Sequence, residues 1–206
     1  MKIVVHENGP FMVNSYLVIN ESNNKGIMID PGADIGFLIK KIQDEAIILD
    51  AIVCTHGHID HIGGVSILKE KFNALIYINE FEEDIVSSAP LQARMFGVPN
   101  PGVISIDRNL PSSGMIELAE LQFALFHTPG HSPGSISLLH NDLLFSGDTL
   151  FNMSIGRTDL PGGDYEKIIT SIQKHLFTLP EETRVLCGHG PETSIGIEKR
   201  FNPFLK

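Results

Sequence analysis

The chain has 206 residues, 42% of them hydrophobic, and a formal net charge of −10 at pH 7. This length fits one α/β domain over residues 1–206 better than two small domains, and the acidic balance argues against a nucleic-acid partner. No apolar run approaches the roughly 20 residues of a membrane span, so we expect no membrane partner. Residues 1–5 are too short and too β-like for a signal peptide, which leads us to expect a cytoplasmic protein.

The first half of the chain alternates predicted strands and helices. Strands are expected at residues 1–5, 11–19, 26–29, 46–54 and 74–78. Asp34 is a predicted N-cap, because Phe37, Leu38 and Ile42 follow it at helical spacing. A second helix is expected after Gly64.

Residues 79–102 are expected to be irregular, since they contain Pro90, Pro99 and Pro101. Two interpretations remain open for this segment: plain connecting structure, or a mobile wall over a binding site.

The second half repeats the order of strands followed by helix. Strands are expected at residues 116–126, 135–139, 143–145 and 184–187, and helices at 164–177 and 193–200. Asp164 is the predicted cap of the first of these helices. Two β-rich halves with outer helices indicate an α/β fold built as a four-layer αββα sandwich.

Metal-ligating side chains are concentrated at residues 55–61, which read THGHIDH. His56, His58, Asp60 and His61 directly follow an apolar run that is typical of a buried strand. Imidazole is the commonest protein ligand for transition metals, and α/β folds place their chemistry at the carboxyl ends of strands. This stretch therefore predicts a metal site rather than a chance cluster of surface histidines.

Three further donors follow strand-like runs beside Gly or Pro: His131, Asp148 and His189. Together with the four donors above they make five histidines and two aspartates. A closed structural zinc site needs four ligands. Seven donors favour two metal ions that share a carboxylate and keep positions open for water and substrate.

Cys54 and Cys187 each lie two residues before one of these histidines. Alternation along a strand buries such thiols as small apolar side chains, and this is the interpretation we favour over a functional one.

These motifs, in this order, resemble the metallo-β-lactamase superfamily. The stretches NSY (residues 14–16) and IDPG (29–32) resemble its opening. The later stretches are similar to the glyoxalase II branch, the hydroxyacylglutathione hydrolases, in its small single-domain form: TPGHSPGS (128–135), SGDTLF (146–151), GRTD (156–159) and GHGPET (188–193).

The resemblance implies the αββα fold and a sorting of the ligands. His56, His58 and His131 would hold the first ion, and Asp60, His61 and His189 the second, with Asp148 as the bridge. It implies two divalent ions, zinc above all, with iron or manganese as alternatives.

The implied activity is hydrolysis of a small-molecule thioester such as S-lactoylglutathione. A metal-bound hydroxide attacks the acyl carbon, and a metal stabilises the oxyanion. Asp60 and Asp148 are the predicted catalytic carboxylates, with Asp60 also orienting the water.

Tyr16 and Arg157 are the substrate-side candidates, and Arg157 suits a bidentate clamp on a carboxylate. Because the sequence ends at Lys206, we expect no counterpart of the C-terminal helical domain that binds glutathione in full-length glyoxalase II. A Lys-Phe-Tyr segment of that enzyme is replaced by Arg157, Thr158 and Asp159. We therefore expect weak binding of glutathione thioesters or a different thiol carrier.

Two other functions remain. An iron-dependent persulfide dioxygenase of the same superfamily, which oxidises glutathione persulfide, would use His56, His131 and Asp148. The stretch around His189 is hydrolase-like, because the dioxygenases tend to have Asp-Tyr after that histidine. A module that only sequesters or senses metal is disfavoured by the excess of donors over a closed site.

Overall fold

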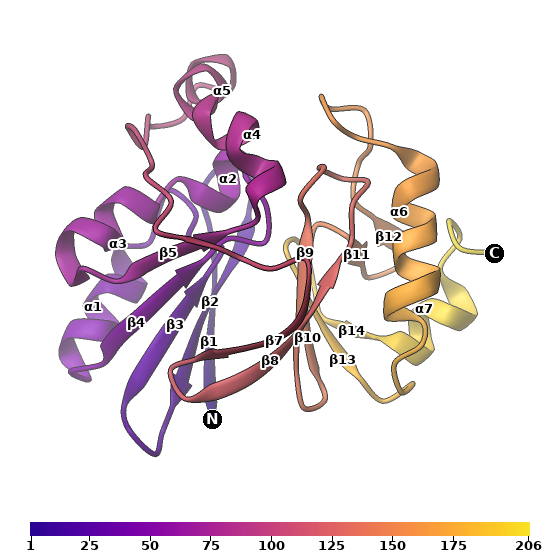
Figure 1. Ribbon diagram of the computed structural model, residues 1–206, viewed down its shortest axis with the longest axis horizontal. Helices are drawn as coiled ribbons and strands as arrows, with labels where there is room; N and C mark the ends of the chain where they lie inside the picture. Colours follow the sequence, from indigo (N-terminus) through magenta and orange to yellow (C-terminus); the bar gives the residue numbers. More distant parts are fainter. The chain divides into compact units, whose positions relative to one another are not determined.

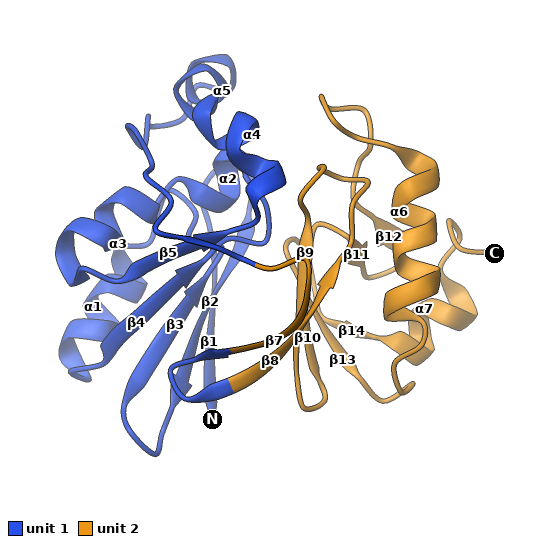
Figure 2. Ribbon diagram, viewed as in Figure 1, with its two compact units in different colours: residues 1–110, 117–121 blue, residues 111–116, 122–206 orange.

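The computed structural model describes residues 1–206 and contains two six-stranded β-sheets, each with helices packed against one face (Figure 1). Figure 2 shows two compact units: unit 1 comprises residues 1–110 and 117–121, and unit 2 comprises residues 111–116 and 122–206. The expected pairing of β-rich halves with outer helices is confirmed within each unit. The assignment of residues 1–206 to a single domain stays a prediction.

The sheet of unit 1 has the strand order β1-β2-β3-β4-β5-β6. Its strands are β1 (Lys2–Asn8), β2 (Val13–Asn20), β3 (Lys25–Ile29), β4 (Ile48–Val53), β5 (Leu75–Ile78) and β6 (Arg108–Asn109). Strands β1 to β3 form an antiparallel meander, and β3 to β6 run parallel. The carboxyl ends of β3, β4 and β5 therefore meet at one edge of the sheet, where parallel sheets place their functional residues.

Helices α1 (Gly36–Asp44) and α3 (Val65–Phe72) cover one face of this sheet (Figure 1). Their fully buried residues Leu38 and Leu68 pack into the core of unit 1. The prediction that Asp34 caps α1 is wrong, because the helix begins at Gly36 and Ile35 is its N-cap. The backbone N–H of Asp34 instead donates to Asn8 Oδ1 at 3.3 Å.

The segment after β5 is helical, which corrects the expectation of an irregular stretch. It contains the 3-10 turn η1 (Glu80–Glu82), α4 (Glu83–Ser87) and α5 (Ala89–Phe96). Pro90 lies in the first turn of α5, where its missing N–H costs no intrahelical hydrogen bond. Gly97 ends the helix in the left-handed conformation, so Pro99 and Pro101 follow the helix end rather than interrupt it.

The sheet of unit 2 has the strand order β14-β13-β10-β9-β8-β7. Its strands are β7 (Ser113–Leu118), β8 (Leu121–His127), β9 (Ile136–His140), β10 (Leu143–Gly147), β13 (Arg184–Cys187) and β14 (Thr193–Ser194). A separate small ribbon pairs β11 (Leu150–Phe151) with β12 (Ser154–Ile155). Strands β10 and β13 are parallel, so the residues after both strands lie at the same sheet edge.

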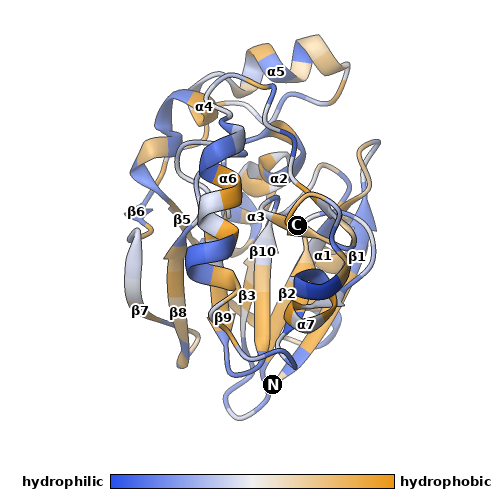
Figure 3. Ribbon diagram, turned by 90° about the vertical axis from the view of Figure 1, so that its right-hand side faces the viewer, coloured by the Kyte–Doolittle hydropathy of each residue, from blue (hydrophilic) through white to orange (hydrophobic).

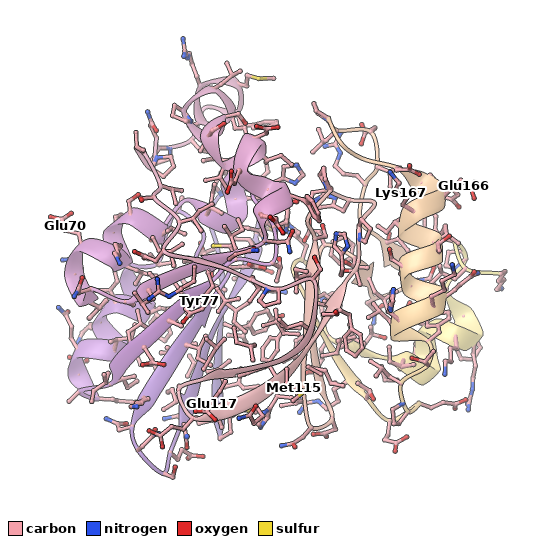
Figure 4. All side chains as sticks on the ribbon, viewed as in Figure 1. Glu70, Tyr77, Met115, Glu117, Glu166 and Lys167 are labelled. Atoms are coloured by element: carbon pink, nitrogen blue, oxygen red, sulfur yellow. The ribbon has the colours of Figure 1, made fainter.

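Helix α6 (Tyr165–Ser171), the π-helical turn η2 (Ile172–Leu176) and α7 (Ile195–Phe201) pack on one face of the second sheet (Figure 1). The predicted cap is confirmed, because the Asp164 side chain accepts the N–H of Lys167. Strand β10 is hydrophobic over its first three residues, 143–145, while α6 carries both hydrophobic and hydrophilic bands (Figure 3). Glu166 projects from α6 away from the sheet (Figure 4), and Lys167 beside it is also exposed. None of the helices has the length and apolar content needed to cross a membrane.

A hairpin replaces the single strand expected at residues 116–126. The chain turns at Ala119 and Glu120, whose φ angles are 51° and 62°. Consecutive positive φ values are typical of a tight hairpin turn, which usually contains Gly, Asn or Asp. These residues supply no such signal. The Asp50 carboxylate accepts the Ala119 N–H at 2.9 Å, and Lys25 pairs with Glu120 at 2.8 Å.

A pair of neighbours on α3 tests the packing of unit 1. Leu68 is 0% exposed and Ile67 is 42% exposed. Leu68→Ala should lower the free energy of unfolding by about 2–5 kcal/mol, because it leaves a cavity in the core. Ile67→Ala should lower it by less than about 1 kcal/mol, since that side chain is already in water. Urea denaturation measures both values, and equal losses would contradict the packing.

Candidate metal centre

The predicted histidine motif follows β4. This strand pairs with β3 and β5, and its buried side chains fix its position between them. Residues 54–58 leave the sheet, and the short helix α2 (Ile59–Ile62) begins directly after His58. His56 and His61 are 1% and 0% exposed, His58 is 9% exposed, and Asp60 is partly exposed. The motif is therefore an inward-facing group of donors and not a set of solvated surface histidines.

Unit 1 brings its four predicted donors together. A ring nitrogen of His56 lies within 4.8 Å of one of His58 and of one of His61. The ring centroids are 4.9 Å apart for His56 and His58 and 4.1 Å apart for His56 and His61. Asp60 Oδ2 lies 3.6 Å from His61 Nε2. Donors that belong to one short stretch thus form one cluster.

Asp30, at the end of β3, fixes the orientation of this cluster. Its Oδ2 lies 3.0 Å from His61 Nδ1, and its carboxylate also accepts the backbone N–H and the hydroxyl of Thr55, both at 2.7 Å. Because the Thr55 hydroxyl donates its proton to Asp30, its oxygen can only accept from His56. His56 Nδ1, which lies 3.1 Å from this oxygen, is therefore the donor. Both imidazoles then keep the Nε2 lone pair for a ligand.

A second layer of hydrogen bonds holds Asp30 in place. Its φ angle is 49°, a left-handed conformation that Asp tolerates better than most residues. Ser15 Oγ donates to the Asp30 carbonyl at 2.6 Å and accepts the Gly32 N–H at 3.0 Å. Asn8 Nδ2 in turn donates to Ser15 Oγ at 2.8 Å. The bend after β3 is thereby fixed by buried polar contacts.

Unit 2 brings the other three predicted donors together. His131 lies in the loop between β8 and β9, Asp148 follows β10, and His189 follows β13. Asp148 Oδ2 lies 3.5 Å from Nε2 of His131 and 3.5 Å from Nε2 of His189. His131 and Asp148 are 2% and 8% exposed, whereas His189 is partly exposed. One carboxylate oxygen thus stands at equal distances from two imidazole nitrogens.

The His131 ring is oriented by a backbone carbonyl. Its Nδ1 lies 2.8 Å from the Arg157 carbonyl oxygen, which can only accept, so Nδ1 donates and Nε2 keeps its lone pair. Gly156 makes this approach possible, because a Cβ there would overlap the Asp148 carbonyl oxygen and lie 3.2 Å from His131 Cβ. The absence of a side chain at residue 156 therefore helps to set the direction of the His131 lone pair.

Residues 8–189 match the sequence profile of the metallo-β-lactamase superfamily. The chain belongs to this superfamily. It is 40% identical over 199 residues to the hydroxyacylglutathione hydrolase GloC of Haemophilus influenzae, across 95% of this chain and 93% of that protein. The predicted resemblance to the hydroxyacylglutathione hydrolase branch is thereby confirmed, and the findings support a metal-binding hydrolase.

Three solved structures share the fold. The BLEG-1 B3 metallo-beta-lactamase has a TM-score of 0.93 at 37% identity, with 100% of both chains covered. TTHA1623 in a di-iron-bound form has a TM-score of 0.88 at 37% identity, covering 98% of this chain and 100% of that one. ETHE1 from Myxococcus xanthus has a TM-score of 0.81 at 28% identity, covering 98% and 84%. The predicted α/β metallo-β-lactamase fold is confirmed.

The donors in each unit fit the metal centre that the superfamily implies. Imidazole nitrogens and carboxylate oxygens are ligands that zinc, iron and manganese accept. Two ligand atoms bound to one ion at about 2.1 Å and tetrahedral angles lie roughly 3.4 Å apart. The distances of 3.5 Å from Asp148 Oδ2 to His131 and His189 have this spacing, and they exceed an ordinary hydrogen bond.

The thiols beside the donors are buried, as predicted. Cys54 and Cys187 are 1% and 0% exposed. Burial raises the pKa of the Cys54 thiol well above its usual range and raises the pKa of Cys187 to about 12. A neutral buried thiol behaves as a small apolar side chain, so the cysteines pack the strands β4 and β13 rather than take part in chemistry.

The two substrate-side candidates lie in different surroundings. Tyr16 is in β2 and is 5% exposed. The Arg157 side chain is 58% exposed and makes two hydrogen bonds to Asp159, at 2.7 Å and 2.6 Å. These bonds lower the pKa of the Asp159 carboxyl to about 2. The roles of Tyr16 and Arg157 in binding substrate stay predictions.

Three residues that support the unit 1 donors were not predicted from the sequence. Asp30 lies in the IDPG stretch, but a carboxylate after a strand does not indicate which histidine it will orient. Glu82 accepts the Gly57 N–H at 2.7 Å, and Gln92 accepts the Ile59 N–H at 3.0 Å. Both come from the helical segment after β5, whose fold was itself missed.

Asp30 offers a direct test of the support for His61. Asp30→Asn keeps the shape and tolerates the positive φ, but it leaves one acceptor oxygen for three donors. A buried donor without a partner costs about 1–3 kcal/mol, so the free energy of unfolding should fall by at least that amount. The metal content per chain, measured by plasma mass spectrometry, should fall with it. Asp44→Asn, an exposed control on α1, should change neither quantity.

Proposed function

We propose that this protein is a cytoplasmic, binuclear metallohydrolase that cleaves a small-molecule thioester. The observation that carries this proposal is the position of Asp148 Oδ2, which is 3.5 Å from Nε2 of both His131 and His189. A carboxylate between two imidazoles suits a ligand shared by two ions, and two-ion sites are typical of hydrolases. The relative GloC, a hydroxyacylglutathione hydrolase, supports the substrate class.

We further propose that the donors of unit 1 and unit 2 join in one centre. The superfamily match at residues 8–189 includes both donor groups, which supports this grouping. The first ion would be held by His56, His58 and His131. The second ion would be held by Asp60, His61 and His189, and Asp148 would bridge the two.

The bound ions would supply a water of lowered pKa and a Lewis acid for the acyl carbonyl. The protein's own residues prepare the site for that chemistry. Asp30, Thr55 and the Arg157 carbonyl hold three of the five histidines in the tautomer that leaves Nε2 unprotonated: His61, His56 and His131, respectively. Asp60 is partly exposed in the first turn of α2, where its carboxylate would orient the attacking water.

In the proposed reaction, water adds to the acyl carbon and the carbon–sulfur bond breaks. The products are a carboxylic acid and a thiol. Because the pKa of a thiol is near 8.5, the thiolate can leave without being protonated by a strong acid first. Zinc is the proposed metal, with iron or manganese as alternatives, and TTHA1623 has been crystallised in a di-iron-bound form. No nucleic-acid or membrane partner is proposed.

The second candidate is a persulfide dioxygenase, because ETHE1 shares the fold at 28% identity. This activity would use one iron held by His56, His131 and Asp148. It gives no role to His189, whose Nε2 is as close to Asp148 as that of His131. The arrangement therefore favours the hydrolase.

Parallel assays of the purified protein decide between the candidates. Metal content is measured together with hydrolysis of S-lactoylglutathione, hydrolysis of a β-lactam and oxygen uptake on glutathione persulfide. Two metal ions per chain with thioester cleavage are expected. One iron per chain with oxygen uptake would replace the proposal by the dioxygenase, and β-lactam cleavage without thioester cleavage would overturn the substrate class.

Asp148→Ala should reduce thioester hydrolysis by more than about 100-fold and lower the metal content. Mutation of a residue that only hydrogen-bonds to a metal ligand already lowers metal affinity or activity by roughly 10–100-fold, and loss of a shared ligand should have a larger effect. The variant should still fold, which circular dichroism checks. Asp142→Ala, at an exposed position on the turn before β10, is the control and should keep full activity. Near-normal turnover with full metal in Asp148→Ala would show that Asp148 is not the shared ligand.

Arg157 and Asp159 test the substrate clamp in opposite directions. Arg157→Ala should raise KM about tenfold, or about 1.4 kcal/mol of binding, with little change in kcat. Asp159→Ala releases the guanidinium from its present partner and should lower KM. If Arg157 only anchors its loop, both variants will shift KM in the same direction, and steady-state kinetics will reveal it.

A further inference from the structure

Two side chains of the helical segment formed by η1, α4 and α5 (residues 80–96, the α4–α5 segment) bind the backbone of the histidine loop. Glu82 contacts Gly57, which lies between His56 and His58, and Gln92 contacts Ile59, the next residue after them. These contacts lie within unit 1 and are directed at the backbone, so they act on the conformation of the loop rather than on a ligand atom.

Glu82 is the stronger of the two contacts. Its side chain is 0% exposed, and its Oε2 accepts the Gly57 N–H at 2.7 Å. A carboxylate is rarely buried unless its hydrogen bonds compensate for the lost water. An N–H that donates to a carboxylate makes a shorter and stronger bond than one that donates to a neutral acceptor. Glu82 therefore fixes the peptide between two donor histidines.

Gly57 shows that the loop and the segment are in direct contact. A Cβ at this position would lie 3.1 Å from Glu82 Oε2, 3.0 Å from Val86 and 3.2 Å from Ile85. A side chain here would push the loop away from α4. The glycine between the two histidines thus permits the close approach that the Glu82 hydrogen bond requires.

Gln92 ties three helices together. Its Oε1 accepts the N–H of Ile59, the first residue of α2, and such N–H groups have no partner within their own helix. Its Nε2 donates to the Ile85 carbonyl of α4 at 2.8 Å and to Ser88 Oγ at 3.0 Å. The start of α2, which carries Asp60 and His61, is therefore fixed by the same side chain that joins α4 to α5.

Apolar packing also holds the α4–α5 segment, because Val86, Ala89 and Ala93 are buried in the core of unit 1. Helices α4 and α5 have five and eight residues, below the roughly 12–15 residues that an isolated helix needs in water. Leu91 and Met95, on the outer side of α5, are 53% and 70% exposed. The contacts of Glu82 and Gln92 with the histidine loop add to this packing and link the segment to the loop that carries the donors.

We propose that Glu82 and Gln92 are positioning residues that couple metal binding at His56, His58, Asp60 and His61 to the order of the α4–α5 segment. This inference rests on the proposed metal centre. Coupling between two sites is reciprocal: if the segment raises metal affinity through these side chains, then bound metal stabilises the segment to the same degree. Bound metal would then increase the order of this segment.

Hydrogen exchange measured by mass spectrometry tests the coupling on the full chain with and without Zn²⁺. In the wild type, Zn²⁺ should slow exchange in residues 83–96. Glu82→Ala and Gln92→Ala should each weaken Zn²⁺ binding by roughly 10–100-fold, measured against a chromophoric chelator, and should reduce that protection at saturating Zn²⁺. Glu82→Gln keeps an acceptor oxygen for Gly57 and should restore most of the affinity.

Glu198→Ala is the matched control for the loss of a buried carboxylate. Glu198 is also 0% exposed, but it accepts hydrogen bonds from Thr193, Asn202 and Met153 in unit 2. This variant should lower the melting temperature and leave both Zn²⁺ affinity and protection of residues 83–96 unchanged.

The outcomes separate this inference from the proposed function. A wild type that binds no Zn²⁺ would overturn the metal centre itself. A wild type that binds Zn²⁺ without protecting residues 83–96, or a folded Glu82→Ala variant with wild-type affinity, would overturn the coupling alone. If Glu82→Ala does not fold, Gln92→Ala and the wild-type exchange experiment still decide the question.

Discussion

An imidazole that donates the proton of one ring nitrogen to a fixed acceptor presents the lone pair of its other nitrogen in a fixed direction, and both units are built around such acceptors. Asp30 provides the acceptor for His61, and the Arg157 carbonyl provides it for His131. Each acceptor needs an unusual piece of backbone: a left-handed aspartate after β3 in one unit, and Gly156 close to the Asp148 carbonyl in the other. The strands bring the chain to these positions, and the acceptors determine which nitrogen is available.

The metal-binding residues and the proposed substrate-side residue differ in their freedom to move. The imidazoles of His56 and His61 are held by buried hydrogen bonds to Thr55 and Asp30, and the α4–α5 segment adds two contacts to the backbone of their loop. Arg157 has its carbonyl fixed by His131, while its guanidinium is exposed and pairs with Asp159. Exposed ion pairs contribute little to stability and exchange partners easily. In the proposed clamp, a substrate carboxylate would replace Asp159 as the partner of Arg157 without disturbing His131.

Local signals in the sequence were sufficient for the donors and for most strands. The apolar run of β4 and the clustered donor side chains after it are contiguous, so periodicity and residue type identify both. The hairpin at Ala119 and Glu120 could not be predicted, because contacts with Asp50 and Lys25 stabilise it and no turn residue announces it. Glu82 could not be predicted either. It is one of several acidic residues in its stretch, and only its burial distinguishes it from its exposed neighbours. Pro90, Pro99 and Pro101 led to the prediction of an irregular segment, although they lie in the first turn of α5 and after its end.

The most direct test of the account is the anomalous difference density of crystals of the Zn²⁺-loaded protein, recorded on both sides of the zinc absorption edge. The account predicts two zinc peaks, with Asp148 bound to both. The first peak should be bound by His56, His58 and His131, and the second by Asp60, His61 and His189. A single peak, or peaks bound only by residues of one unit, would contradict the claim that both sets of donors form one binuclear centre.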